Sequence, residues 1–385
     1  DTLANCIDTN AIHASLTAIK NKDTDVNIAL TTINTITESQ VTHLNLVTDL
    51  TQGTVSISID GNADKLAALS TNASQTGTAA LTIVVNDVAT AVQGKAIVDA
   101  TSIATVDFSA AGLTGALATY IGTGVNTIHG NLTGIKNKDA NVNIAITPAI
   151  ENITADQVTQ LNNIAAATTG TVTVTLDGNV AELDDLAASG TSATCAFTIV
   201  VDDVATVAQG KTIVDATSIA TVDFSTAGLT GALATYIAAS GNAIHASLTD
   251  IKNKDGDINI VVTPAVTNIT AAQVIQINNI AAATTGTVTA SIDGNATELD
   301  DLSANGTSAT CAFTIVVDDA VSVAQGKTIV DATSITTVDF SAAGVADTLA
   351  NCIDTNAIHA SLTAIKNKDT DVNIALTTIN TITES

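Results

Sequence analysis

The 385-residue sequence contains no arginine, methionine or tryptophan, and only two prolines, two tyrosines and five phenylalanines. All 12 basic residues are therefore lysine, and 38 aspartates and glutamates oppose them, which gives a formal net charge of −26. Nucleic-acid binding needs clustered Lys and Arg to neutralise phosphates, so we expect no nucleic-acid partner. No apolar run reaches the roughly 18 residues of a membrane-spanning helix, so we expect no membrane span in this segment.

The chain is built from long repeats. IVDATSIATVDFS begins at Ile97 and Ile213, and recurs with one change at Ile329, in steps of 116 residues (213 − 97 and 329 − 213). Residues 1–39 recur unchanged as residues 347–385, so the larger period is 347 − 1 = 346 residues. The repeats divide the sequence into a partial unit 1–96, units 97–212 and 213–328, and a partial unit 329–385.

Each repeat alternates strand-like and helix-like segments. In the unit that starts at residue 213, we predict strands over 221–225, 257–262, 284–291 and 311–317, and helices over 229–251, 269–283, 296–304 and 320–330. A Gly-Asn pair interrupts the first of these helices, Pro264 ends the second strand, and a turn is the alternative for the last helix. The pairs Thr37/Gln40, Thr154/Gln157 and Thr270/Gln273 are capping boxes, each typical of a helix start.

This alternation predicts an α/β fold. We expect a βα-solenoid of tandem ~116-residue units, about four strand–helix segments each, with a continuous parallel sheet. The alternative is an all-β solenoid, against which the capping boxes and the Ala-rich stretches argue.

Aspartates gather at turns between the predicted elements. Ca²⁺ binds carboxylate and carbonyl oxygens, so calcium is the candidate cofactor, although none is required. The candidate ligands are Asp202, Asp203, Asp255, Asp257, Asp318 and Asp319. The alternative is that Asp, Asn and Gly serve there as turn and capping residues, since neither an EF-hand loop nor a calcium-binding nonapeptide repeat is present.

Other residue types give weaker signals. Cys311 and Cys352 are candidates for a disulfide, and buried free thiols are the alternative. Lysines in the recurring Lys-Asn-Lys and Gln-Gly-Lys motifs suggest basic rows for acidic neighbours or polysaccharide, or simply helix C-termini. One histidine per repeat, in the pattern IHxxL, has no metal-ligand spacing. A near-identical array offers no convergent catalytic constellation, so we expect no enzyme.

The phrase ITADQVTQLNNIAAATTGTVTVTLDGNVAELDDLAA, residues 153–188, resembles the repeat regions of giant extracellular and cell-surface proteins of bacteria, with Thr/Ala/Asp-rich repeats of the cyanobacterial type. The resemblance implies secretion, attachment to a cell surface or a fibrous layer, often with calcium. We therefore expect a structural protein: a segment of a long repetitive extracellular filament, sheath or cell-surface fibre, which binds itself end to end and laterally. The alternatives are a rigid spacer of a large adhesin, or a repetitive surface that binds polysaccharide or ice.

Overall fold

The computed structural model describes residues 1–69, 79–100, 105–108, 110–124, 126–186, 194–216, 221–224, 227–302, 310–332, 337–340, 344–355 and 357–377. The chain divides into two compact units. Unit 1 is Asp1–Ile199 with Asp215–Ala220, and unit 2 is Val200–Val214 with Thr221–Ser385. Strand β11 (Thr194–Val201) and helix α10 (Val207–Ala216) contain residues of both.

Strands and helices alternate along unit 1. Its strands are β1 (Ile7–Asp8), β2 (Ala11–Ile12), β3 (Ile28–Ala29), β4 (Val55–Gly61), β5 (Ala79–Val85), β6 (Ala89–Thr90), β7 (Thr105–Asp107), β8 (Leu113–Gly115), β9 (Ile144–Ile146) and β10 (Thr171–Gly178). Its helices are α1 (Leu3–Cys6), α2 (Ala14–Lys20), α3 (Glu38–Leu50), α4 (Ala63–Leu66), α5 (Ala91–Ala100), α6 (Leu117–Tyr120), α7 (Gly130–Lys136), α8 (Ala155–Ala167) and α9 (Val180–Leu183).

Unit 2 repeats the same alternation. Its strands are β12 (Thr221–Asp223), β13 (Leu229–Gly231), β14 (Ile260–Val266), β15 (Thr287–Gly294), β16 (Thr310–Val317), β17 (Thr337–Asp339), β18 (Val345–Asp347), β19 (Ile353–Asp354), β20 (Ala357–Ile358) and β21 (Ile374–Leu376). Its helices are α11 (Leu233–Tyr236), α12 (Ala246–Lys252), α13 (Ala271–Ala283), α14 (Ala296–Leu299), α15 (Val323–Ala332), α16 (Leu349–Cys352) and α17 (Ala360–Lys368).

The main sheets are parallel and follow the order of the chain. In unit 2 the sheet order is β13-β14-β15-β16-β17, and in unit 1 one sheet has the order β3-β4-β5-β7. The register in unit 2 pairs Leu229↔Ile260, Ile260↔Val288, Val288↔Cys311 and Thr314↔Thr337. Each strand of this sheet therefore pairs with the next one along the chain, and a single connection joins the two. The predicted mixed α/β class with parallel strands is confirmed.

The strands form several sheets rather than the one continuous sheet that the sequence predicted. In unit 2, β17 pairs with β16, whereas β18 pairs with β21 in a separate two-stranded sheet. Between β17 and β18 the chain passes through Gly344, whose φ of +75° only glycine adopts readily. No sheet closes into a barrel within the described ranges.

The helix predicted over residues 229–251 with a Gly-Asn break is wrong before the break, whereas α12 forms after it. Leu229 to Gly231 form a strand, the four-residue helix α11 follows, and an antiparallel bridge joins Ile237 to Ile244 before α12. Gly241, at φ +91°, turns the chain between the bridged residues. The predicted stop at Pro264 is also wrong, because β14 continues to Val266 with a shift of register, and a bulged strand accommodates proline.

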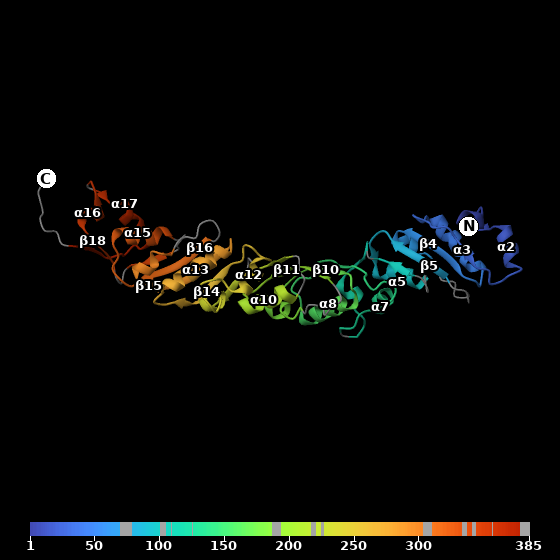
Figure 1. The fold of residues 1–385 in the computed structure, drawn as a ribbon, viewed down its shortest axis with the longest axis horizontal. Helices are drawn as coiled ribbons and strands as arrows, with labels where there is room; N and C mark the ends of the chain where they lie inside the picture. The colour runs from blue at the N-terminus through green and yellow to red at the C-terminus, as the bar shows by residue number, and fades with distance from the viewer. Residues whose placement is uncertain are drawn as a thin grey trace. The chain divides into compact units, whose positions relative to one another are not determined.

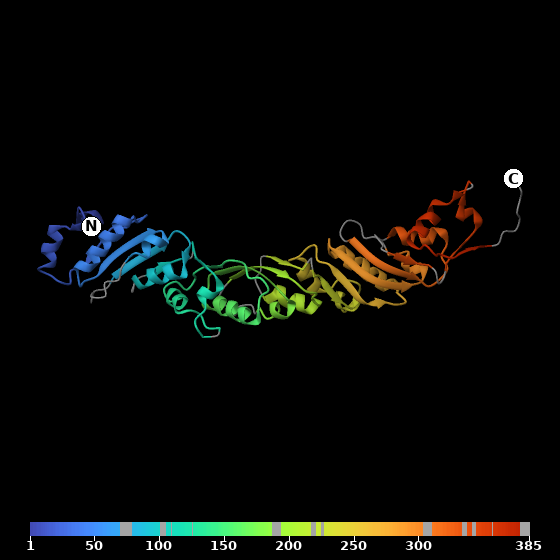
Figure 2. The same ribbon diagram turned by 180° about the vertical axis from the view of Figure 1, so that it is seen from behind.

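The longer helices begin where the capping boxes place them. In α13 the Thr270 hydroxyl accepts a hydrogen bond from the Gln273 backbone N–H, and the Gln273 side chain accepts one from the Thr270 N–H. Val274, Ile277 and Ile280 form its buried face. In both ribbon views this helix lies alongside the long strands β15 and β16 (Figures 1 and 2). The equivalent helices α3 and α8 have the same cap.

Candidate functional site at the junctions between repeats

A buried aspartate joins neighbouring strand–helix segments at three equivalent positions. In unit 2 the Asp255 carboxylate is 5% exposed, and its Oδ2 accepts a hydrogen bond of 2.6 Å from the backbone N–H of Phe224, which lies far earlier in the chain. Its Oδ1 accepts a second bond, of 3.3 Å, from the Asp257 N–H. The same arrangement links Asp139 to Phe108 at 2.6 Å and Asp369 to Phe340 at 2.7 Å. We call each aspartate and its phenylalanine N–H an Asp–Phe rung.

Burial dominates the electrostatics of these rungs. The pKa of Asp255 is raised to about 6, first by burial and then by the neighbouring Asp257 carboxyl, while the two backbone N–H groups oppose the rise. Burial also raises the pKa of Asp139 and of Asp369. Beside Asp139, the residue two positions on is Asn141, which contributes no second carboxyl.

A glycine lets the two segments approach closely beside the rung. Gly228 has φ +74°, and a Cβ built on it would lie 2.7 Å from the Asn259 carbonyl oxygen. The next residue, Leu229, donates its N–H to that same oxygen at 2.8 Å. Any larger residue at position 228 would therefore be strained and would push the neighbouring strand away. Gly112 and Gly344 occupy the equivalent positions.

A buried threonine lies at the Asp255 and Asp139 junctions, and an equivalent threonine follows the Asp23 turn. Thr284 is 2% exposed, and its hydroxyl donates to the Ile258 carbonyl at 2.7 Å and accepts from the Gly286 N–H at 2.9 Å. Thr168 and Thr51 make the same bonds in unit 1. Because Asp and Thr side chains bond to main-chain groups of another segment, they satisfy buried backbone atoms that no ladder reaches.

The helices meet through the glycine of the Gln-Gly-Lys motif. A Cβ on Gly326 of α15 would lie 2.7 Å from Cδ1 of Ile365 in α17, and Gly94 of α5 has the same relation to Ile135 of α7, at 2.8 Å. Ile135 and Ile365 are both fully buried. The glycine therefore creates the space into which the isoleucine of the next segment inserts.

Among the six predicted calcium ligands, the carboxylates of Asp255 and Asp319 accept hydrogen bonds from the main chain. Asp255 and Asp257 lie together in one turn, with the Asp255 carboxylate committed to the rung. Asp318 and Asp319 follow β16, and Asp319 Oδ1 accepts from the Ala296 N–H at 2.7 Å, which caps the short helix α14. Asp202 and Asp203 follow β11 in the same way. No group of three or more His, Cys, Asp or Glu side chains suited to a metal occurs in the part of the chain that the structure describes.

The structure does not bring Cys311 and Cys352 together. Both are buried free thiols, as is Cys6, and Cys195 is buried as well. Cys311 lies in β16, just before the part of that strand that pairs with β17, whereas Cys352 lies in α16, beyond β17 and β18. The two sulfurs therefore belong to different segments. Burial raises the pKa of the thiols of Cys311 and Cys352.

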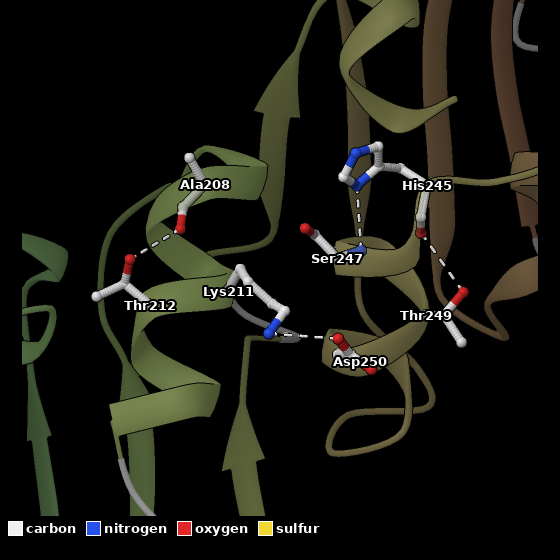
Figure 3. Close-up of polar contacts among 7 residues, drawn as sticks. All are labelled: Ala208, Lys211, Thr212, His245, Ser247, Thr249 and Asp250. Atoms are coloured by element: carbon white, nitrogen blue, oxygen red, sulfur yellow. Dashed lines mark hydrogen bonds and ion pairs between the residues drawn. The ribbon is translucent and has the colours of Figure 1, made fainter. Parts of the chain in front are cut away.

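The repeated histidine caps a helix. His245 precedes α12, and its Nδ1 accepts a hydrogen bond of 3.1 Å from the Ser247 N–H (Figure 3). Lys211 of α10 forms an ion pair of 3.3 Å with Asp250 on α12, seen in the same view. A pocket of about 250 Å³ lies beside this cap, and its lining includes Thr206, Thr230, His245 and Ser247. The Nδ1 of this imidazole is therefore occupied by the first turn of α12.

The two copies of the repeated terminal sequence are buried on opposite sides. Ile365 is fully buried against the preceding α15, but the identical Ile19 is 51% exposed. Conversely Ile28 is 7% exposed beneath β4, whereas its counterpart Ile374 is 49% exposed.

Sequence reasoning missed the rungs because they link residues that are far apart in the chain. Their signal is the similar separation of the two residues, which is |i − j| = 31 for Phe108–Asp139 and Phe224–Asp255 and 29 for Phe340–Asp369. No helix among the residues with assigned structure has the length and apolarity needed to cross a membrane. The chain matches no protein-family model, no curated protein sequence and no solved structure.

Proposed function

We propose that this chain is a structural protein, a segment of a long extracellular βα-solenoid that forms a filament, sheath or cell-surface fibre. Its mechanism is mechanical, because each strand–helix segment buries its apolar face on the next one. In such an array the stability is approximately a sum of contributions from segments and from their nearest-neighbour interfaces.

The Asp–Phe rungs carry this proposal. They repeat at the period of the sequence, with distances of 2.6, 2.6 and 2.7 Å. Parallel strands that pair with their neighbours in chain order support the same conclusion. A junction reproduced so closely is expected of a repeat whose task is to stack, whereas a catalytic site needs an asymmetric set of converging groups.

The partner is a further copy of the same repeat, joined end to end, because successive segments within the chain already pair strand to strand in one register. The net charge of −26 opposes lateral association, so cations such as Ca²⁺ promote bundling by screening.

Electron cryo-microscopy of the purified chain over a concentration series, with and without Ca²⁺, tests this function. We expect filaments of constant width whose axial repeat corresponds to the larger period of the sequence, and EDTA to separate bundles without shortening the filaments. A chain that stays monomeric at every concentration, together with source material that contains no fibres, would overturn the proposal.

A further inference from the structure

We propose that the pocket beside Gly231 binds a carboxylate, either that of a small aliphatic acid or that of an acidic side chain on a neighbouring chain. This site goes beyond the fibre function and does not depend on it. In the next repeat the chain fills the equivalent site with a carboxylate of its own, whereas the repeat at Gly231 keeps the site and lacks the carboxylate.

The next repeat shows what the site holds. Its residue equivalent to Gly231 is Asp347, since 231 + 116 = 347. Asp347 Oδ2 accepts a hydrogen bond of 3.0 Å from the backbone N–H of Val323, the first residue of α15, and Oδ1 accepts from the Thr348 N–H and from Asn351 Nδ2, both at 2.7 Å. Burial alone would raise the pKa of Asp347, but these hydrogen bonds outweigh it and the pKa is lowered. The position therefore stabilises a carboxylate in its charged form.

The start of α15 leaves an N–H group for this carboxylate. Ser322 and Gln325 form a capping box, in which the Ser322 hydroxyl accepts from the Gln325 N–H at 3.2 Å and Gln325 Oε1 accepts from the Ser322 N–H at 3.2 Å. The Val323 N–H lies between these two groups and has no acceptor within the helix. The partial positive charge at a helix N-terminus favours an anion at this N–H.

Helix α10 begins in the same way but lacks the carboxylate. Thr206 and Gln209 form the same capping box, with hydrogen bonds of 3.1 and 3.2 Å, and Val207 is the first residue of the helix. Gly231 brings no side chain to the place of the carboxylate. Among the residues that the structure describes, the Val207 N–H has no acceptor. The repeat therefore keeps the donor and lacks its anion.

The place of the missing carboxylate opens into the pocket of about 250 Å³, which Val207 and Gly231 help to line. None of its lining residues is acidic. His245 Nδ1 accepts from the Ser247 N–H at 3.1 Å, so the neutral ring carries its proton on Nε2 and is a donor there (Figure 3). The rest of the lining is mostly apolar and includes Ala208, which favours a short aliphatic chain behind the carboxylate. The net charge of −26 disfavours a dianion such as sulfate.

Exchange of two residue pairs between the repeats tests this site in the full chain. Gly231→Asp with Thr235→Asn gives the α10 site the Asp–Asn pair of the next repeat. A Cβ on Gly231 would lie 2.7 Å from Thr235 Oγ1, and the second substitution removes that hydroxyl. Conversely, Asp347→Gly with Asn351→Thr gives the α15 site the Gly–Thr pair. A variant with all four substitutions has the composition of the wild type.

The readout is the backbone amide of the first helical residue in each repeat. It is followed by NMR of the deuterated, ¹⁵N-valine-labelled chain during titration with sodium acetate or sodium butyrate, with sodium chloride and sodium sulfate at equal ionic strength as controls. Val207→Ala assigns the Val207 signal, since Ala91 holds the equivalent position (207 − 116 = 91). Carbonyl-¹³C serine assigns the Val323 signal, because Ser322-Val323 is the only Ser-Val step in the sequence.

We expect either carboxylate to shift the Val207 signal to saturation and neither control salt to do so. Val323 should not respond, because Asp347 fills its site. Gly231→Asp with Thr235→Asn should weaken the response of Val207 at least about tenfold. Asp347→Gly with Asn351→Thr should make Val323 respond, and the variant with all four substitutions should interchange the two responses.

A dilution series without added acid distinguishes the two sources of the carboxylate. A Val207 shift that grows with the concentration of the chain assigns the carboxylate to a neighbouring chain, and a shift that is independent of concentration assigns it to a free acid.

Any of three results would overturn the site. They are a Val207 signal that no carboxylate shifts, a Val207 signal that chloride or sulfate shifts equally, and a Val207 response that persists unchanged with Gly231→Asp and Thr235→Asn. An unchanged signal of Val274 in α13 shows in each variant that the unit is folded. The fibre function stands in all three cases, because the Asp–Phe rungs do not involve this pocket.

Discussion

The Asp255 rung predicts an unusual pH dependence of local stability. The pKa of Asp255 is raised from 3.8 to about 6 in the folded chain, so the protonated carboxyl is favoured by folding. Its contribution to stability is therefore fully present below the unfolded pKa near 4 and is lost as the pH rises through about 6. A pKa difference of about 2 corresponds to about 3 kcal/mol of differential stabilisation.

Hydrogen exchange at the Phe224 amide measures this pH dependence of local stability directly, because that N–H donates to Asp255. After correction for intrinsic rates, protection should fall between about pH 3.5 and about pH 6.5 in the wild type. The Asp255→Asn variant should lack this dependence. The wild type and the variant are compared by the slope of protection against pH and not by absolute stability. The asparagine side chain also replaces one acceptor oxygen of the carboxylate by a donor NH₂ group, which changes the stability at every pH. Phe108, whose rung uses Asp139, is an internal control for global effects of charge in that variant.

A second variant tests what raises the pKa of Asp255. Asp257→Asn removes the neighbouring carboxyl that contributes to the shift, so the midpoint of the Phe224 profile should move to lower pH. Identical pH profiles in the wild type and Asp255→Asn, or protection that increases with pH, would refute the reasoning about burial.

Two further matched pairs test the packing. Gly228→Ala should lower the free energy of unfolding of unit 2 by about 1–3 kcal/mol, since φ is +74° and the neighbouring backbone is in contact, whereas Gly256→Ala, with nothing within 4 Å, should be neutral in urea unfolding. Tyr236→Phe should cost about 1 kcal/mol because its hydroxyl donates to the Val261 carbonyl at 3.0 Å. Tyr120→Phe should cost nothing, because that buried hydroxyl has no partner among the described residues; equal losses in the two tyrosine variants would contradict this.

The parts of the fold that local rules govern were predictable. Capping boxes located α3, α8 and α13, and the same Thr-x-x-Gln rule, applied to Thr206 and Gln209, would have fixed the start of α10. The prediction of a helix over 229–251 failed before the Gly-Asn break. There the same apolar spacing belongs to a short strand, a single helical turn and a β-bridge. Periodicity alone does not separate such short elements.

The candidate site was less predictable, because its contacts are made at long range. The aspartates at turns were singled out as candidate calcium ligands, with turn and capping roles as the alternative, and neither interpretation pairs Asp255 with a backbone N–H of another segment. Nothing near Asp255 in the sequence points to Phe224. The division into several sheets was also hidden, since it depends on which strands pair with each other and not on the local pattern of any one strand.

In each rung the aspartate side chain contacts the main chain of the neighbouring segment, not a side chain. The Asp255 carboxylate needs a backbone N–H at position 224, and every residue except proline supplies one. A segment therefore does not have to match the side chains of a particular neighbour at this contact. Recombination between near-identical gene repeats would add or remove whole units and leave every rung intact. Changes of length in such an array would then be tolerated far more readily than changes of the turn residues within it.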